Sequence, residues 1–339
     1  MTLGVALGGG GAKGAYQVGV FGALAECGLW DKVSCVSGTS VGALNALLFA
    51  KTSAENAERI WLKMTFQKMF DTTEVILDKT RRLQGLVQRL GRSRGIVEAV
   101  DQIVTTGAAS HDDFLARFFR DEGIDFTLPV QGQKALFATC CEKSVFLTPH
   151  YFCLNGHHPS EIENIILASA SLPLMFSCRA IEGKHYLDGG TRDAVFHYGQ
   201  RGMEGADNVP VLPLVRSGCD VVIAVKLSGE KLDLSRFSKT TIIEIEPAVP
   251  FGGPFTVGDF SETQQKIRMG YADTLARLKV NKALLATRKI TPASAREVIA
   301  HFNTTAVVDK EDASMRKAVW STLAAKRLLT SFTAEDKAH

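Results

Sequence analysis

Apolar and polar residues follow two alternating patterns along the chain, which predict strands and helices in turn. Short and nearly continuous apolar runs are typical of buried strands, whereas apolar residues that recur every three or four positions are typical of amphipathic helices. The strands predicted from the runs cover residues 3–7, 33–36, 135–139, 145–148, 178–181, 185–187, 220–227 and 241–246. The helices predicted from the periodic stretches cover residues 15–27, 41–48, 54–69, 96–104, 112–120, 160–170, 261–285 and 313–329.

Strands that alternate with helices predict an α/β fold of three layers, in which a mainly parallel sheet is covered by helices on both faces. We expect residues 1–285 to form one domain with a mainly helical region over 51–131, and residues 286–339 to form a helical C-terminal extension. Two helix starts carry capping signals. Ser160 and Glu163 have the spacing of a capping box, and Thr291 precedes Pro292 as an N-cap precedes a first-turn proline.

The stretch Gly38-Thr39-Ser40-Val41-Gly42 joins a predicted strand to a predicted helix. A serine between two glycines at such a junction fits a nucleophile elbow. Gly38 and Gly42 suit this turn because it leaves no room for Cβ atoms. The positive end of the following helix would also stabilise an anion that forms at Ser40. Ser40 is therefore our candidate nucleophile, and the alternative is an ordinary glycine-rich turn.

A run of glycines separates the first predicted strand from the first helix and presents backbone N–H groups at a helix N-terminus, which is an anion site. Its spacing is also that of a dinucleotide-binding fingerprint, but the second strand ends at Gly38 without the carboxylate that a ribose needs. No Lys-Ser or Lys-Thr pair follows, as a P-loop requires. An oxyanion hole that faces Ser40 fits better. The candidate donors are Gly9, Gly10, Gly11 and Ala12, and the motif is completed by Lys13 and Gly14.

The turn Asp188-Gly189-Gly190 follows the predicted strand over 185–187. Active residues in open α/β sheets gather at the carboxyl ends of strands, so Asp188 is expected near Ser40 and the glycine loop. An α/β-hydrolase would instead need a histidine after the acid. The histidines after Asp188 are His197, His301 and His339, and none of them follows a predicted strand.

The chain resembles the patatin-like phospholipase family in three stretches, which are, in chain order, the glycine loop, the elbow at Ser40 and the turn at Asp188. Residues 168–173 and 207–211 support the resemblance. The resemblance covers most of residues 1–285. It implies hydrolysis of lipid acyl esters, above all of phospholipids, by a catalytic dyad without a metal or other cofactor. In that dyad Ser40 would be the nucleophile and Asp188 the base, and the glycine loop would be the oxyanion hole.

One departure from the family pattern is the stretch over 191–206, which separates the Asp-Gly-Gly turn from Asn208-Val209-Pro210. It is either a surface insertion without a role in function, or a loop that covers the site or contacts an effector. Two other functions remain open. One is a carboxylesterase or thioesterase that acts on soluble acyl substrates, and the other is a non-catalytic nucleotide-binding module.

The composition indicates an ordinary globular protein, because 45% of the 339 residues are hydrophobic and the net charge is only +3. This charge is too small to indicate a nucleic-acid partner. The seven cysteines form no C-x-x-C pair, so we expect neither a disulfide framework nor a zinc site but a reducing cytoplasm. The sequence shows no signal peptide and no apolar run long enough to span a bilayer.

The stretch over 79–94 is basic and amphipathic. It has six Lys and Arg residues, and its apolar residues Leu83, Leu86, Val87 and Leu90 fall on one helical face. That face would pack on the core of the domain, or it would lie on an anionic lipid surface. The second alternative predicts peripheral contact with a membrane.

Overall fold

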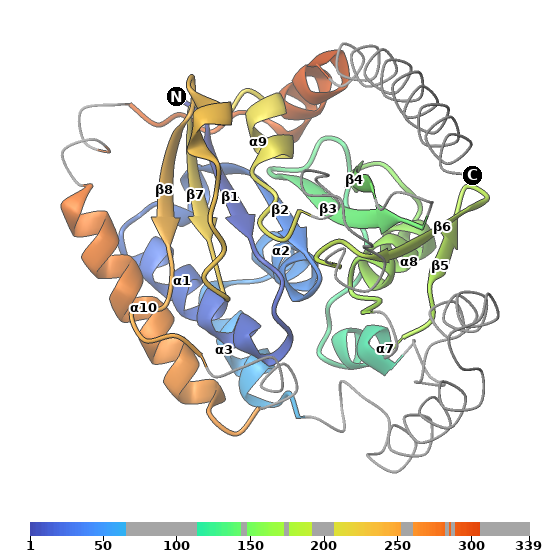
Figure 1. The fold of residues 1–339 in the computed structure, drawn as a ribbon, viewed down its shortest axis with the longest axis horizontal. Coiled ribbons are helices and arrows are strands. Elements are labelled where there is room, and N and C mark those ends of the chain that lie inside the picture. Colours follow the sequence, from blue (N-terminus) through green and yellow to red (C-terminus); the bar gives the residue numbers. More distant parts are fainter. Residues whose placement is uncertain are drawn as a thin grey trace, which may run out of the picture.

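A computed structural model of the chain describes residues 1–65, 114–143, 148–172, 176–191, 207–251, 260–281, 285 and 289–305. The predictions for the helices over 96–104 and 313–329, for the basic stretch over 79–94 and for the insertion over 192–206 lie outside these residues. Within the described residues, eight strands form one sheet in the order β5-β6-β3-β2-β1-β7-β8, with β4 paired to β3 (Figure 1).

The strands are β1 (Leu3–Leu7), β2 (Val33–Thr39), β3 (Ala135–Glu142), β4 (Thr148–Cys153), β5 (Arg179–Ile181), β6 (Lys184–Asp188), β7 (Val221–Val225) and β8 (Thr241–Ile245). The neighbours β3, β2, β1, β7 and β8 run parallel. The pairs β3–β4, β3–β6 and β5–β6 are antiparallel. The strand predicted over 145–148 meets β4 at Thr148, and its residues 145–147 lie outside the described residues.

The helices are α1 (Ala15–Glu26), α2 (Val41–Lys51), α3 (Ala54–Leu62), α7 (Phe114–Asp121), α8 (Pro159–Ser169), α9 (Leu212–Arg216), α10 (Thr263–Val280) and a helix over 295–305. Side chains of the central strands alternate between two cores, because successive residues of a strand point to opposite faces. On β7, Val221 and Ile223 join the core formed with α1, α2, α3, α7, α8 and α10. Val222 joins the core formed with α9 and the helix over 295–305. The α/β/α fold with a mainly parallel sheet is thus confirmed.

Two predicted helix caps are wrong. The helix predicted from Ser160 begins at Pro159, with His158 as N-cap, and the carboxylate of Glu161 accepts the N–H of His158 at 3.0 Å. Proline has no N–H to lose and its fixed φ suits the first helical position, so Pro159 sets the start. The helix predicted from Thr291 is instead capped by Ser294, whose side chain accepts the N–H of Glu297 at 3.3 Å.

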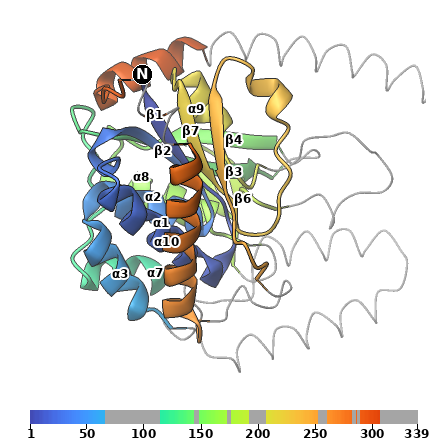
Figure 2. The ribbon, with the colours of Figure 1, turned by 90° about the vertical axis from the view of Figure 1, so that its left-hand side faces the viewer.

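Residues 289–305 join the start of the chain. The N-terminal amine donates to the carbonyl of Lys289 at 2.9 Å, and the N–H of Thr291 donates to the carbonyl of Met1 at 3.0 Å. The helix over 295–305 (red) lies beside α9 in Figure 1 and in Figure 2, and the hydroxyl of Thr305 donates to the carbonyl of Arg216 at 2.9 Å. Its Phe302 ring lies 4.7 Å from the ring of Phe137 on β3. This part of the chain therefore packs on the sheet. The predicted domain boundary after residue 285 stays a prediction.

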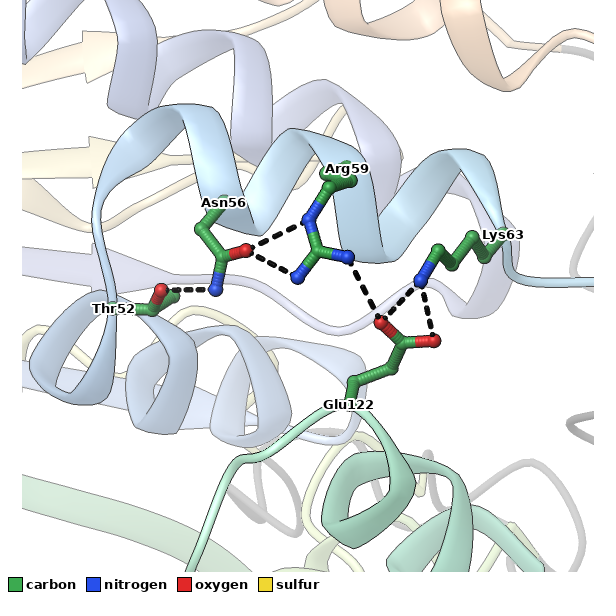
Figure 3. A network of polar contacts seen from close by, with 5 residues as sticks. All are labelled: Thr52, Asn56, Arg59, Lys63 and Glu122. Atoms are coloured by element: carbon green, nitrogen blue, oxygen red, sulfur yellow. Dashed lines mark hydrogen bonds and ion pairs between the residues drawn. The ribbon is translucent and has the colours of Figure 1, made fainter.

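The residues on either side of the 66–113 stretch are linked by ion pairs (Figure 3). Lys63 follows α3 and its ammonium lies 2.7 Å from the carboxylate of Glu122, which follows α7. Arg59 on α3 lies 3.6 Å from the same carboxylate.

None of the described helices is long and apolar enough to cross a membrane.

Candidate active site

Ser40 occupies a sharp turn between β2 and α2. Its backbone has φ 57° and ψ −125°, a conformation that residues other than glycine rarely adopt and that surrounding contacts must hold in place. Gly38 and Gly42 permit the turn, because a Cβ on Gly38 would overlap the carbonyl of Gly42. Thr39 and Val41 are buried, whereas Ser40 is partly exposed. The geometry is that of a nucleophile elbow.

Asp188 reaches Ser40 from a strand that runs the opposite way. Thr39, at the end of β2, is paired with Thr139 of β3, and the next residue of β3, Cys140, is paired with Asp188. Because β6 is antiparallel to β3, its last residue arrives at the level where β2 ends. Ser40 and Asp188 therefore lie close together, as predicted. The prediction rested on the carboxyl ends of parallel strands, whereas β6 runs antiparallel to its neighbour β3.

The carboxyl group of Asp188 is buried, with 3% of the residue exposed. Burial raises the pKa of Asp188 to about 6, because it penalises the charged form. Two hydrogen bonds oppose this rise in pKa: one from the side chain of Ser40, and one from the N–H of Gly190 at 2.7 Å. The side chain of Ser40 is thus hydrogen-bonded to a carboxyl group that is more basic than an ordinary aspartate.

The glycine loop lies against Ser40. A Cβ placed on Gly9 would be 3.1 Å from the Cβ of Ser40. The N–H of Gly9 donates to the carbonyl of Asn208 at 3.0 Å, so this predicted oxyanion donor is already engaged. The N–H groups of Gly10, Gly11 and Ala12 have no acceptor within the described residues. Three of the four predicted oxyanion donors are thus without an acceptor among the described residues.

A buried polar network fixes both ends of this loop. The side chain of Gln17 on α1 donates to the carbonyl of Gly8 at 2.7 Å, and Asn45 on α2 donates to the carbonyl of Gly14 at 3.0 Å. Asn45 also donates to Gln17 at 2.7 Å and accepts from the indole of Trp61 at 2.7 Å. The network holds the loop against the helix that follows Ser40. Gln17 and Asn45 were not among the predicted site residues, although each is a polar residue within a mainly apolar helix, which is a signal that could have pointed to them.

Asp207 and Asn208 connect the three motifs. The hydroxyl of Thr39 donates to the carbonyl of Asp207 at 2.8 Å, and the N–H of Asp207 donates to the carbonyl of Gly189 at 3.1 Å. The Asn208 amide donates to the carbonyl of Gly9 at 3.3 Å and to the buried carboxylate of Glu230 at 2.5 Å. No pattern in the sequence pointed to Glu230, which follows β7 and is 9% exposed.

Lys13 of the glycine motif is buried and contacts the segment after β7. Its ammonium donates to the hydroxyl of Ser228 at 3.3 Å. Burial lowers the pKa of Lys13, the nearby Glu230 opposes this effect, and Lys266 adds to it.

Of the three histidines considered for a triad, His301 packs against Gly218, and His197 and His339 lie outside the described residues.

Comparison with known proteins identifies the family. A sequence model described as patatin-like phospholipase matches residues 5–199, which are more than half of the chain. The chain belongs to the patatin-like phospholipase family. The matched range includes the glycine loop, the elbow at Ser40 and the turn at Asp188, and it ends before Asn208.

Individual named proteins match this chain over short segments. Patatin-like phospholipase domain-containing protein 7 of Rattus norvegicus is 37% identical over 95 residues, which are 28% of this chain and 7% of that protein. Lysophospholipase nte1 of Aspergillus terreus is 48% identical over 50 residues, which are 15% of this chain and 3% of that protein. Each match thus covers less than a tenth of the relative.

Solved structures align over more of the chain but at low identity. VipD from Legionella pneumophila aligns with a TM-score of 0.44 and 15% identity, over 82% of this chain and 67% of that chain. Human GIVD cytosolic phospholipase A2 aligns with a TM-score of 0.42 and 10% identity, over 88% of this chain and 60% of that chain. At these TM-scores the likeness carries no conclusion about the site.

Proposed function

We propose that the protein hydrolyses fatty-acyl ester bonds of lipids, with phospholipids as the main substrates, through a Ser40–Asp188 dyad. The observation that carries the proposal is the hydrogen bond between the elbow serine and a buried carboxyl group whose pKa is about 6. Membership of the patatin-like phospholipase family supports the lipid substrate. The names of the relatives, a phospholipase domain protein and a lysophospholipase, point the same way.

In the proposed reaction the Ser40 hydroxyl attacks the ester carbonyl while its proton moves to the carboxylate of Asp188. A pKa of about 6 leaves this carboxylate mostly ionised at pH 7 and makes it a stronger base than an ordinary aspartate. Asp188 then gives the proton to the departing alcohol. A water molecule then attacks the carbonyl of the acyl-serine and gives its proton to Asp188. The bond between the acyl group and Ser40 Oγ breaks, the fatty acid leaves, and Asp188 returns the proton to Ser40.

The glycine loop supplies most of the stabilisation of the oxyanion in this proposal. A carboxylate is a weak base for a hydroxyl group, so the developing negative charge must be stabilised elsewhere. The N–H groups of Gly10, Gly11 and Ala12 are the proposed donors, and a single donor of this kind is typically worth about 10²- to 10³-fold in rate. The N-terminus of α2 adds its positive end beside Ser40.

Hydrolysis of phospholipid vesicles tests the proposal. We expect the purified protein to release free fatty acid and lysophospholipid, measured by mass spectrometry, and Ser40→Ala to release neither. A soluble p-nitrophenyl acyl ester, assayed in parallel, distinguishes a lipid hydrolase from a general carboxylesterase. Hydrolysis of the soluble ester alone would favour the esterase, and equal lipid release by the Ser40→Ala variant would refute the proposed nucleophile.

The proposal includes peripheral contact with the lipid surface, because the substrate lies in a bilayer or a similar aggregate. The basic stretch over 79–94 lies outside the described residues and is our sequence-based candidate for this contact. Each Lys or Arg near an anionic surface contributes about 1 kcal/mol of attraction.

A further inference from the structure

The hydroxyl group of Ser169, the last residue of α8, bonds directly to the main chain of the elbow. Its Oγ accepts the backbone N–H of Ser40 at 2.9 Å and donates to the carbonyl of Thr139 on β3 at 2.6 Å. Ser169 is fully buried, so water does not compete for either bond. A buried hydroxyl that both accepts and donates has its orientation fixed.

The same end of α8 also contacts the main chain of Asp188. The N–H of Asp188 donates to the carbonyl of Ser171 at 3.0 Å, two residues beyond Ser169. Thr139, which accepts from Ser169, is adjacent in β3 to the residue paired with Asp188. Gly189 lies so close to Thr139 that a Cβ there would overlap its carbonyl. The end of α8 therefore contacts the backbones of both members of the proposed dyad.

Ser40 needs such a support because its backbone conformation is strained. A residue with φ 57° and ψ −125° persists only where surrounding contacts hold it. The bond from Ser169 satisfies the backbone N–H of this residue. Without it the N–H would lose its partner, and the peptide would be free to turn away from its present angle.

We propose that Ser169 is a positioning residue for the reaction at Ser40: its hydroxyl holds the elbow peptide at the angle that directs the serine Oγ toward Asp188. This inference rests on the proposed function of Ser40. Reacting groups displaced by about 1 Å lose about 100-fold in rate. Only the side chain of Ser169 can be tested by substitution in this way. The bond that Asp188 receives from this region is made to the backbone carbonyl of Ser171, which a substitution does not remove.

The test compares Ser169→Ala with Ser217→Ala as a matched control. Ser217 is also buried, at 4% exposed, and its hydroxyl donates to the carbonyl of Pro213 at 2.7 Å, away from both dyad residues. Each variant loses one buried hydroxyl group. Ser169→Ala loses two hydrogen bonds and Ser217→Ala loses one, so both should lower the melting temperature, Ser169→Ala by more. Only Ser169→Ala should lower kcat, by about 10- to 100-fold, with KM changed less than about threefold.

The pH profile gives a second readout that a loss of stability would not move. A weaker bond from Ser40 removes one of the two contacts that oppose the raised pKa of Asp188. The midpoint of kcat/KM against pH should therefore shift upward in Ser169→Ala and stay unchanged in Ser217→Ala. Ser169→Cys is a second variant for the case that Ser169→Ala does not fold. Cysteine has nearly the same shape as serine but its sulfur is a weak hydrogen-bond acceptor, so this variant should fold and have a lowered kcat.

The outcomes separate this inference from the proposed function. An active wild type with a slow Ser169→Cys and an unaffected Ser217→Ala supports the positioning role. An active wild type in which Ser169→Cys and Ser217→Ala have equal kcat and equal pH midpoints overturns that role and leaves the dyad intact. A folded wild type with no hydrolysis and no reaction with a fluorophosphonate overturns the proposed function, and the positioning role with it.

Discussion

Ser40→Ala and Asp188→Asn are each expected to lower kcat by about 10⁴-fold, and the double variant is expected to lower it no further. The two residues serve one proton transfer, so removing either removes the step. Asparagine keeps an oxygen that can accept the N–H of Gly190, and the fold should survive. Steady-state kinetics on vesicles, with circular dichroism as the folding check, measures the effect.

A matched control is His301→Ala, because His301 lies on the helix over 295–305 and packs against Gly218. It should retain wild-type kinetics. Substantial activity in Asp188→Asn would contradict the role of Asp188 as the base. Losses that multiply in the double variant would show that the two residues act in separate steps.

The activity of the wild type is expected to rise with pH through a midpoint near 6, because Asp188 must be ionised to accept the proton. Below the midpoint kcat/KM should fall about tenfold for each pH unit. A midpoint near 4 would mean that burial does not raise the pKa of Asp188 in solution. The hydrogen bonds from the side chain of Ser40 and from the N–H of Gly190 would then outweigh the desolvation of the carboxylate.

The same raised pKa predicts how stability depends on pH. Between pH 3.8 and about 6 the folded state holds a proton on Asp188 that the unfolded state has lost, so the free energy of unfolding falls as pH rises through this window. The decrease in the free energy of unfolding that Asp188 causes is complete above about pH 6 and absent below about pH 4. Asp188→Asn should therefore raise the free energy of unfolding by up to about 3 kcal/mol at pH 8 and by little at pH 4. Urea unfolding at both pH values measures this difference.

The elbow at Ser40 and the loop from Gly9 to Gly14 could be predicted because their chemistry is local. Glycines that leave room for a sharp turn and apolar runs that form buried strands are visible within a few neighbouring residues. The position of Asp188 after a strand was predictable for the same reason. The antiparallel direction of β6 was not, because the direction of a strand depends on which strand it pairs with.

Contacts between distant residues explain what the sequence could not show. The bond between Ser169 and Ser40 spans 129 positions, and the bond that Asn208 makes to Gly9 spans 199. Both side chains lie in stretches that supported the family resemblance, yet no local pattern assigns either of them a partner. Glu230 is surrounded by polar residues in the sequence and resembles an ordinary surface residue. Only the folded chain buries it beside Asn208.

Covalent labelling by a fluorophosphonate tests the central claim most directly, because this reagent reacts with a serine only when its hydroxyl is activated. Intact-protein mass spectrometry followed by peptide mapping locates the adduct. A Ser40–Asp188 dyad predicts one adduct per chain on the peptide that contains Ser40, none in Ser40→Ala and slow formation in Asp188→Asn. An adduct on another residue, or none on a folded protein that still hydrolyses lipid, would contradict Ser40 as the nucleophile.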